Sequence, residues 1–153
     1  MTQPVPRSVV AAFYSALAVR DMPTLASYLD DDVVWTISGP VDILPFCGRR
    51  VGKSIVMTML DSDIPALLTR RRFYPNAMLV DGDRAAVLGR LTAIKREGGR
   101  SISYQIAQFI RFRDEKVIEY SSIIDSYDAV EQVLGHSLSV HDGPAAESNL
   151  IAV

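Results

Sequence analysis

Apolar side chains recur every three or four residues in the first part of the chain, which is the spacing of one face of a helix. In the first such segment Phe13 and Leu17 lie on the apolar stripe, and in the second Pro23 suits a first helical turn. The pattern predicts three helices, over residues 8–17, 23–28 and 53–60, the last reaching at most residue 68. Residues 39–52 hold several glycines and prolines and are predicted to form a long loop.

After Thr69 the pattern changes to alternating or continuous runs of β-branched and aromatic residues, which indicate strands. With one earlier run, the predicted strands cover residues 33–37, 72–80, 84–96, 101–113 and 117–124. The last four are separated by three tight-turn signals, Asp81-Gly82-Asp83, Glu97-Gly98-Gly99 and Asp114-Glu115. No helix intervenes to allow parallel pairing, so these four strands are predicted to form an antiparallel meander.

Helices followed by a meander indicate the α+β fold class. The strands that begin at Arg84 and Ser101 are about 12 residues long, against a usual five or six. Strands of this length bend, so we expect a cone-like α+β barrel whose N-terminal helices pack on a strongly curved antiparallel sheet. The concave face would enclose a cavity suited to a ligand. A short helix ends at Leu134, and residues 135–153 are predicted to be a flexible tail.

Composition narrows the class of partner. The chain has 153 residues, of which 48% are hydrophobic, and 16 basic against 18 acidic residues give a net charge of −2. This balance creates no field that would attract a nucleic acid. No apolar run reaches the roughly 18 residues of a membrane span, and the first residues lack the features of a signal peptide. The single cysteine, Cys47, excludes an internal disulfide, so a cytoplasmic protein is expected.

Motifs for cofactors and metals are incomplete. The segment from Gly48 to Ser54 resembles a phosphate-binding loop, but only three residues separate its glycines, where four are required. His136 and His141 lie five residues apart with no cysteine or acidic cluster near them, which does not fit a zinc site. The sequence therefore predicts neither a cofactor nor a metal.

Polar residues at positions that alternate with apolar ones are the candidate binding residues. If the faces chosen by alternation are concave, the cavity holds Arg90, Thr92, Gln108, Tyr120 and Ser122. A buried arginine needs an anionic partner, because an unpaired buried charge costs several kcal/mol. That partner is a carboxylate of the protein or of a ligand. The alternative is that Gln108, Tyr120 and Ser122 only satisfy one another in the core.

Three segments carry a resemblance to a known family: Asp31 to Trp35 after two helices, Phe46 to Val56 leading into the third, and Phe109 to Asp125 through the last turn. With the order of the elements, they make the chain similar to the nuclear transport factor 2-like superfamily, particularly its SnoaL-like bacterial members. The resemblance implies one SnoaL-like domain over residues 1–134, a cone-shaped fold and a homodimer. It leaves the activity open, since the superfamily includes isomerases, cyclases, hydrolases and non-catalytic binders.

Catalytic residues of two enzyme branches are not retained. In ketosteroid isomerases a base, a tyrosine and an acid act together, and the matching positions in this chain hold Ile37, Phe13 and Gln108, respectively. A shift of the alignment by one residue would place Tyr14 at the position of the tyrosine.

Limonene-epoxide hydrolase uses an arginine between two aspartates, and Arg90 matches this arginine. Thr92 and Ser122 stand where that family has its aspartates, and Trp35 and Ile37 stand at its tyrosine and asparagine.

SnoaL-type cyclases use an aspartate near the end of the sheet, for which Asp125 is the first candidate and Glu119 the second. Both are out of phase with the expected pocket face. Asp125 also precedes a predicted helix, where a capping residue is expected. A helix cap is therefore favoured over a catalytic base.

Two functions remain. The first is a SnoaL-like protein that binds a small hydrophobic molecule with a polar or anionic group in an apolar pocket. If such a protein is an enzyme, it would catalyse an isomerase, cyclase or lyase reaction on a hydrophobic carbonyl or carboxylate compound. Trp35 would stack on this molecule, Arg90 would neutralise it, and Gln108, Tyr120 and Ser122 would orient it. The second is a non-catalytic homodimeric interaction or ligand-binding module, in which the face with Gln105 and Phe109 packs against another sheet.

Overall fold

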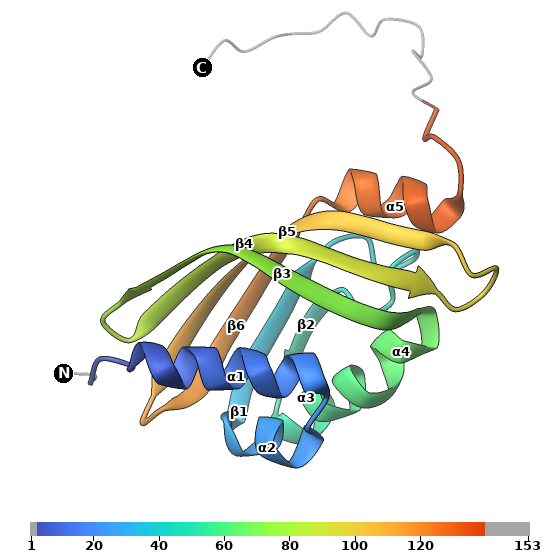
Figure 1. Ribbon diagram of the computed structural model, residues 1–153. Coiled ribbons are helices and arrows are strands. Elements are labelled where there is room, and N and C mark those ends of the chain that lie inside the picture. The colour runs from blue at the N-terminus through green and yellow to red at the C-terminus, as the bar shows by residue number, and fades with distance from the viewer. Residues whose placement is uncertain (1–2, 140–153) are drawn as a thin grey trace, which may run out of the picture.

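The computed structural model describes residues 3–139, which form helices packed on one six-stranded sheet (Figure 1). The helices are α1 (Arg7–Val19), α2 (Met22–Ser27), α3 (Lys53–Thr58), the π-helical turn η1 (Met59–Asp63), α4 (Ile64–Leu67) and α5 (Ser126–Leu134). The strands are β1 (Leu29–Ser38), β2 (Gly48–Val51), β3 (Leu68–Asp81), β4 (Arg84–Lys95), β5 (Ser101–Arg113) and β6 (Lys116–Ile124). The α+β class and the curved sheet with helices across its concave side are confirmed (Figure 1).

The strand order is β2-β1-β6-β5-β4-β3, and β3 to β6 form the predicted antiparallel meander. One pairing differs from the prediction: β1 runs parallel to β6, with Trp35 opposite Tyr120. Parallel strands need a long crossover, and the connection from β1 to β6 spans residues 39–115. The predicted loop 39–52 also contains β2, an edge strand paired with β1. Gly48 and Gly52, at the two ends of this short strand, both have φ of 103°. Because glycines in a sequence indicate a loop, the strand between them was not predicted.

Helix ends follow local chemistry. The Asp21 carboxylate caps α2 by accepting from the backbone N–H of Thr24 at 3.2 Å, and Pro23 lies in the first turn, as predicted. The predicted third helix is continuous in space as α3, η1 and α4, which together cover residues 53–67. Its wider π turn directly precedes Pro65, whose ring has no amide hydrogen to donate to the preceding turn.

Burial alternates along β5 and β6 as expected. On β5 the even-numbered residues from Ile102 to Phe112 are buried, Gln108 among them, and on β6 Tyr120 and Ser122 face the same side. Phe13 of α1 packs over this face, with its ring centre 6.4 Å from that of Tyr120. These strands and α1 therefore form the wall and cover of the interior.

The face predicted for β4 is wrong. Its buried residues are the odd-numbered ones, Ala85 to Ala93, whereas Arg90 is exposed on the outer face. Both faces of β4 carry apolar residues, so the alternation of apolar and polar residues does not show which face is buried. The inner face requires a glycine at position 89, because a Cβ there would lie 2.4 Å from the carbonyl oxygen of Tyr74 and 2.6 Å from the ring of Phe73.

The C-terminal boundary was predicted at residue 134, where α5 ends. Of the predicted tail, residues 140–153 lie outside the described residues. Within the described part, Leu138 packs against the core and its N–H donates to Glu131 Oε1 at 2.8 Å. Among residues 3–139, no helix combines the length and the apolar character that a membrane crossing requires.

The close approach at Gly89 gives a stability test. We expect Gly89→Ala to lower the free energy of unfolding by about 1–3 kcal/mol, because the added methyl meets backbone that is fixed in the sheet. Urea denaturation followed by circular dichroism measures the change. Arg90→Ala, at the exposed neighbouring position, is the control and should change stability by less than about 0.5 kcal/mol. Equal effects of the two substitutions would contradict the packing at Gly89.

Candidate functional site

The concave side of the sheet and the helices enclose a cavity of about 310 Å³. Most of its wall is apolar and comes from α1, α2, the α3–α4 segment, the loop before β2, and the strands other than β2. Several lining residues at the junction of α1 and β3 are exposed, namely Ser15, Ala18, Arg20, Arg72 and Pro75. The cavity therefore opens to solvent between α1 and β3, and its size suits a small organic ligand.

An aromatic pair forms one wall. Trp35 and Tyr120 lie on neighbouring strands in register, and their rings stack with centres 3.6 Å apart and planes 13° from parallel. Only 2% of the surface of Trp35 is exposed. Its indole Nε1 is buried and has no hydrogen-bond partner among the described residues. One face of Trp35 is thus covered by Tyr120, and the buried Nε1 donor is unsatisfied within residues 3–139.

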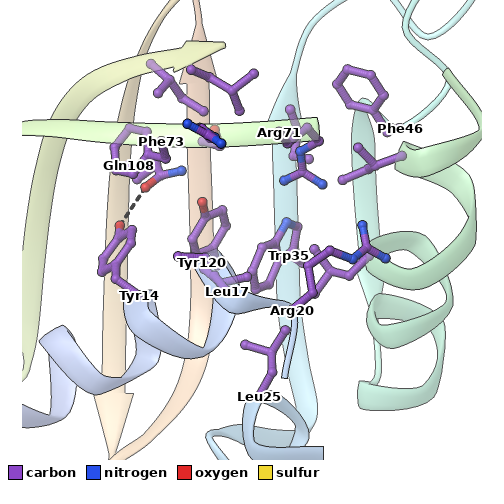
Figure 2. A pocket seen from close by; sticks show the side chains of 18 of the residues that line it. Tyr14, Leu17, Arg20, Leu25, Trp35, Phe46, Arg71, Phe73, Gln108 and Tyr120 are labelled. Carbon is purple, nitrogen blue, oxygen red and sulfur yellow. Dashed lines mark hydrogen bonds between the residues drawn. The ribbon is translucent and has the colours of Figure 1, made fainter. Parts of the chain in front are cut away.

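A hydrogen-bonded pair lies on another side of the cavity (Figure 2). The Tyr14 hydroxyl of α1 donates to Gln108 Oε1 of β5 at 2.5 Å. The ring of Tyr14 also stacks on Phe73, with centres 5.8 Å apart. Tyr14 lines the cavity, whereas Phe13 is fully buried in the core.

Arg71 is a charged cavity residue that the sequence pattern did not place in the interior. The strand predicted over residues 72–80 does not include Arg71, yet Arg71 lines the cavity (Figure 2). The cause is a bulge: Thr69 pairs with Ile94 and Arg72 with Thr92, so β3 has one residue more than β4 there. Arg70 takes the left-handed conformation, with φ of 48°. The extra residue reverses the alternation and turns Arg71 and Phe73 inward.

The cavity wall is positively charged. Its charged residues are Arg20, Arg71 and Arg72, and no carboxylate lines it within residues 3–139. Arg71 forms no ion pair in this part of the chain, and burial lowers the pKa of its guanidinium, as does nearby Arg20. Tyr104 and Tyr120 act in the opposite direction on Arg71. The wall thus presents an incompletely compensated cation in apolar surroundings.

Burial also acts on the phenols of the cavity. It raises the pKa of Tyr104 to about 12, an effect that Arg71 partly offsets. It raises the pKa of Tyr14, with a further contribution from Tyr120. The pKa of Tyr120 is raised by its own burial too, against the effects of Arg71 and the Ser122 hydroxyl. All three are neutral hydrogen-bond donors at ordinary pH.

The structure brings four of the five predicted binding residues to the cavity: Trp35, Gln108, Tyr120 and Ser122. Arg90 is the exception, because it lies on the outer face and donates to Ser103 Oγ at 3.1 Å. Because Arg90 lies on the outer face, it cannot act in the cavity as the matching arginine of the epoxide hydrolases would. The alternative, in which Gln108, Tyr120 and Ser122 only satisfy one another, does not describe Gln108, because its Oε1 accepts from the Tyr14 hydroxyl. That the four residues bind a ligand stays a prediction.

Neither candidate base reaches the cavity. Asp125 is exposed and caps α5, where its Oδ1 accepts from the N–H of Asp128 at 3.3 Å, so the favoured interpretation as a cap is confirmed. Glu119 is exposed and lies 3.7 Å from Arg111. Across the described part of the chain, no group of three or more His, Cys, Asp or Glu side chains could hold a metal ion.

The phenol pKa values predict how stability depends on pH. The cavity tyrosines keep their protons in the folded protein, whereas in the unfolded chain they ionise near the ordinary value of about 10. The folded state therefore binds more protons above pH 10, and stability present below that pH is lost as the pH rises toward about 12. For Tyr104, the difference between the pKa of the folded protein and that of the unfolded chain corresponds to a loss of about 2–3 kcal/mol in the free energy of unfolding.

Urea unfolding at about pH 9 and about pH 11 measures this loss. Tyr104→Phe should lose less stability between the two pH values than the unsubstituted protein, because it lacks one of the shifted phenols. Tyr127→Phe, at an exposed position, is the control. An equally steep loss in Tyr104→Phe would contradict the buried, protonated state of this phenol.

Comparison with known proteins agrees with the architecture. A proposed isomerase from Rhodopseudomonas palustris is 31% identical, with a TM-score of 0.73, and the match covers 83% of this chain and 93% of that chain. TerC, solved with polyporic acid, is 21% identical with a TM-score of 0.74, covering 83% and 96%. An epoxide hydrolase of the limonene-epoxide hydrolase type from M. tuberculosis is 20% identical with a TM-score of 0.67, covering 84% and 88%.

The last two likenesses show the fold alone, because identity is low. No curated protein matches the sequence. The SnoaL-like domain family matches residues 10–120, which include most of α1, strands β1 to β5, the first half of β6 and the bulge that carries Arg71. The chain is a member of the SnoaL-like domain family, and its fold is the nuclear transport factor 2-like, ketosteroid isomerase-like cone.

Proposed function

We propose that this protein binds a small, largely apolar molecule whose anionic oxygen, a carboxylate or an enolate, lies against Arg71. The observation that carries the proposal is the Arg71 guanidinium in an apolar cavity whose described wall has no carboxylate. Arg71 is half-buried, and a cation partly withdrawn from water without a counter-charge loses favourable hydration. An anionic ligand would offset this loss, whereas a cationic ligand would add to it.

The rest of the wall suits the apolar part of such a molecule. Leu91, Ile106 and Ile124 are buried side chains of the cavity wall, and Phe73 and Tyr14 add ring surface. Burial of apolar ligand surface contributes about 25 cal/mol per Å² before the costs of association. Affinity would therefore come from the apolar contacts, and selection for an acidic ligand from Arg71.

If the site catalyses a reaction, its groups favour stabilisation of negative charge on a carbonyl oxygen. Arg71 and the protonated phenols are donors, and electrostatic stabilisation of this kind is a large contribution in enzymes. An isomerase, cyclase or lyase reaction on a hydrophobic carbonyl compound would use it. The likeness to the proposed R. palustris isomerase supports this class of reaction. Non-catalytic binding of the same class of ligand is the alternative, because the described wall supplies no carboxylate base.

Ligand binding is tested with a series of flat carboxylates of increasing size: benzoate, 2-naphthoate and biphenyl-4-carboxylate. We expect at least one to raise the melting temperature and to bind in calorimetry. Arg71→Met should weaken that binding by roughly ten-fold or more, because hydrogen bonds to charged groups contribute about 1.5–3 kcal/mol.

Arg90→Met is the matched control, since it removes a guanidinium from the outer face of the adjacent strand. It should leave the affinity unchanged. Absence of binding by all three carboxylates, or equal affinity in Arg71→Met and the unsubstituted protein, would refute the proposal.

We also propose that the protein is a homodimer formed through the outer face of the sheet. Leu88, Phe109 and Ile123 on β4, β5 and β6 are 46%, 52% and 51% exposed. Leu88 and Ile123 flank Ala107 in one cross-strand row, and Phe109 is two residues further along β5. An apolar surface of this kind on adjacent strands is typical of an interface between proteins.

Replacing Phe109 by Glu should convert the dimer to a monomer, since a charge in an apolar interface is left without a partner. Light scattering coupled to size-exclusion chromatography measures the mass. Tyr127→Glu, an equally exposed aromatic position on α5, is the control and should remain dimeric. A monomeric unsubstituted protein at micromolar concentration would overturn this proposal without affecting the binding proposal.

A further inference from the structure

Trp35 has a buried donor whose acceptor is absent from the described chain. The residue is 2% exposed, and its Nε1 has no hydrogen-bond partner among residues 3–139. An unsatisfied buried donor lowers the stability of the folded state, and most such groups in folded proteins have a partner. An indole N–H can only donate, so the missing group must be an acceptor.

The donor points into the same part of the cavity as Arg71. Figure 2 shows the nitrogen-bearing edge of Trp35 directed toward the Arg71 guanidinium, and both residues line the cavity. Tyr120 is a neighbour common to both, because its ring stacks on Trp35 with centres 3.6 Å apart and its phenol raises the pKa of Arg71. A guanidinium has five donors and no acceptor. Two groups that can only donate thus lie on the same side of the cavity.

The opposite polar group of the cavity is already paired. The Tyr14 hydroxyl donates to Gln108 Oε1 at 2.5 Å, and the Tyr14 ring stacks on Phe73. The Tyr14 hydroxyl therefore needs no ligand atom, and this end offers ring surface, whereas Ser122 Oγ, across from Gln108 on β6, is buried without a partner among residues 3–139. The cavity is asymmetric, with open donors near Trp35 and Arg71 and an aromatic surface near Tyr14 and Phe73.

We infer that Trp35 Nε1 and the Arg71 guanidinium form one carboxylate-binding subsite, and that the ligand is a flat, hydrophobic monocarboxylate oriented with its apolar body toward Tyr14 and Phe73. A carboxylate has two oxygens and about four acceptor positions, so it accepts from both donors at once. The inference rests on the proposed function and assigns to Trp35 a hydrogen-bonding role in place of stacking on the ligand.

The single tryptophan makes the test direct, because the chain gives one indole N–H resonance in a ¹H–¹⁵N spectrum. The probes are the carboxylate that binds most tightly in the series above and its analogue with an ethyl group in place of the carboxylate. We expect the carboxylate to shift the indole proton downfield, as a new hydrogen bond does, and the ethyl analogue to leave it without a downfield shift.

Affinity gives a second readout. Trp35→Phe keeps an aromatic ring against Tyr120 but removes the donor, and it should weaken the affinity for the carboxylate by roughly five- to ten-fold. The affinity for the ethyl analogue should fall by no more than about two-fold, since this analogue makes no hydrogen bond to Trp35. If Trp35→Phe fails to fold, as judged by circular dichroism, the indole resonance of the unsubstituted protein still decides the matter.

The outcomes separate the two proposals. A carboxylate that binds in an Arg71-dependent manner, with no downfield shift of the indole proton, overturns the subsite and leaves the proposed function intact. Binding that does not depend on Arg71 overturns both. A downfield shift with the selective affinity loss in Trp35→Phe supports the subsite.

Discussion

The bulge between Thr69 and Arg72 is the constraint on which the chemistry of this cavity depends. One additional residue in β3 reverses the inward and outward alternation as far as the next register shift, between Pro75 and Ala77, so Arg71 and Phe73 enter the cavity. The left-handed conformation of Arg70 costs about 1–2 kcal/mol, and the long pairing of β3 with β4 holds it in place. With the register unbroken, Arg70 and Arg72 would occupy the inner face instead.

The resulting electrostatics distinguish this chain from relatives that rely on acidic residues. The positions that the resemblance assigns to acids in ketosteroid isomerases and epoxide hydrolases hold Gln108, Thr92 and Ser122. The cavity instead contains a guanidinium, an indole N–H and protonated phenols, which are all donors. Such a wall can stabilise negative charge on a ligand oxygen, but its described residues offer no carboxylate to remove a proton.

The sheet uses both of its faces, which accounts for the high apolar content of the chain. Its inner face packs under α1 and lines the cavity, with Phe13, Trp35 and Tyr120 forming a connected aromatic group. Its outer face carries exposed apolar side chains on β4, β5 and β6. The two apolar faces also explain why alternation succeeded on β5 but failed on β4. On β5, Gln105 and Arg111 mark the outer face, whereas the inner face of β4 consists largely of alanine and glycine.

The sequence by itself determined the α+β class, the meander, the first two helices and the cap at Asp125, because these depend on local periodicity, turn residues and capping groups. It also determined the inward face of β5 and β6, and hence the places of Gln108, Tyr120 and Ser122. Only the tertiary structure decided the parallel pairing of β1 with β6, the edge strand β2, and the exchange of Arg90 for Arg71 as the interior cation. These features depend on strand register and on contacts between distant segments, such as Phe73 over Gly89, which no local pattern along the chain encodes.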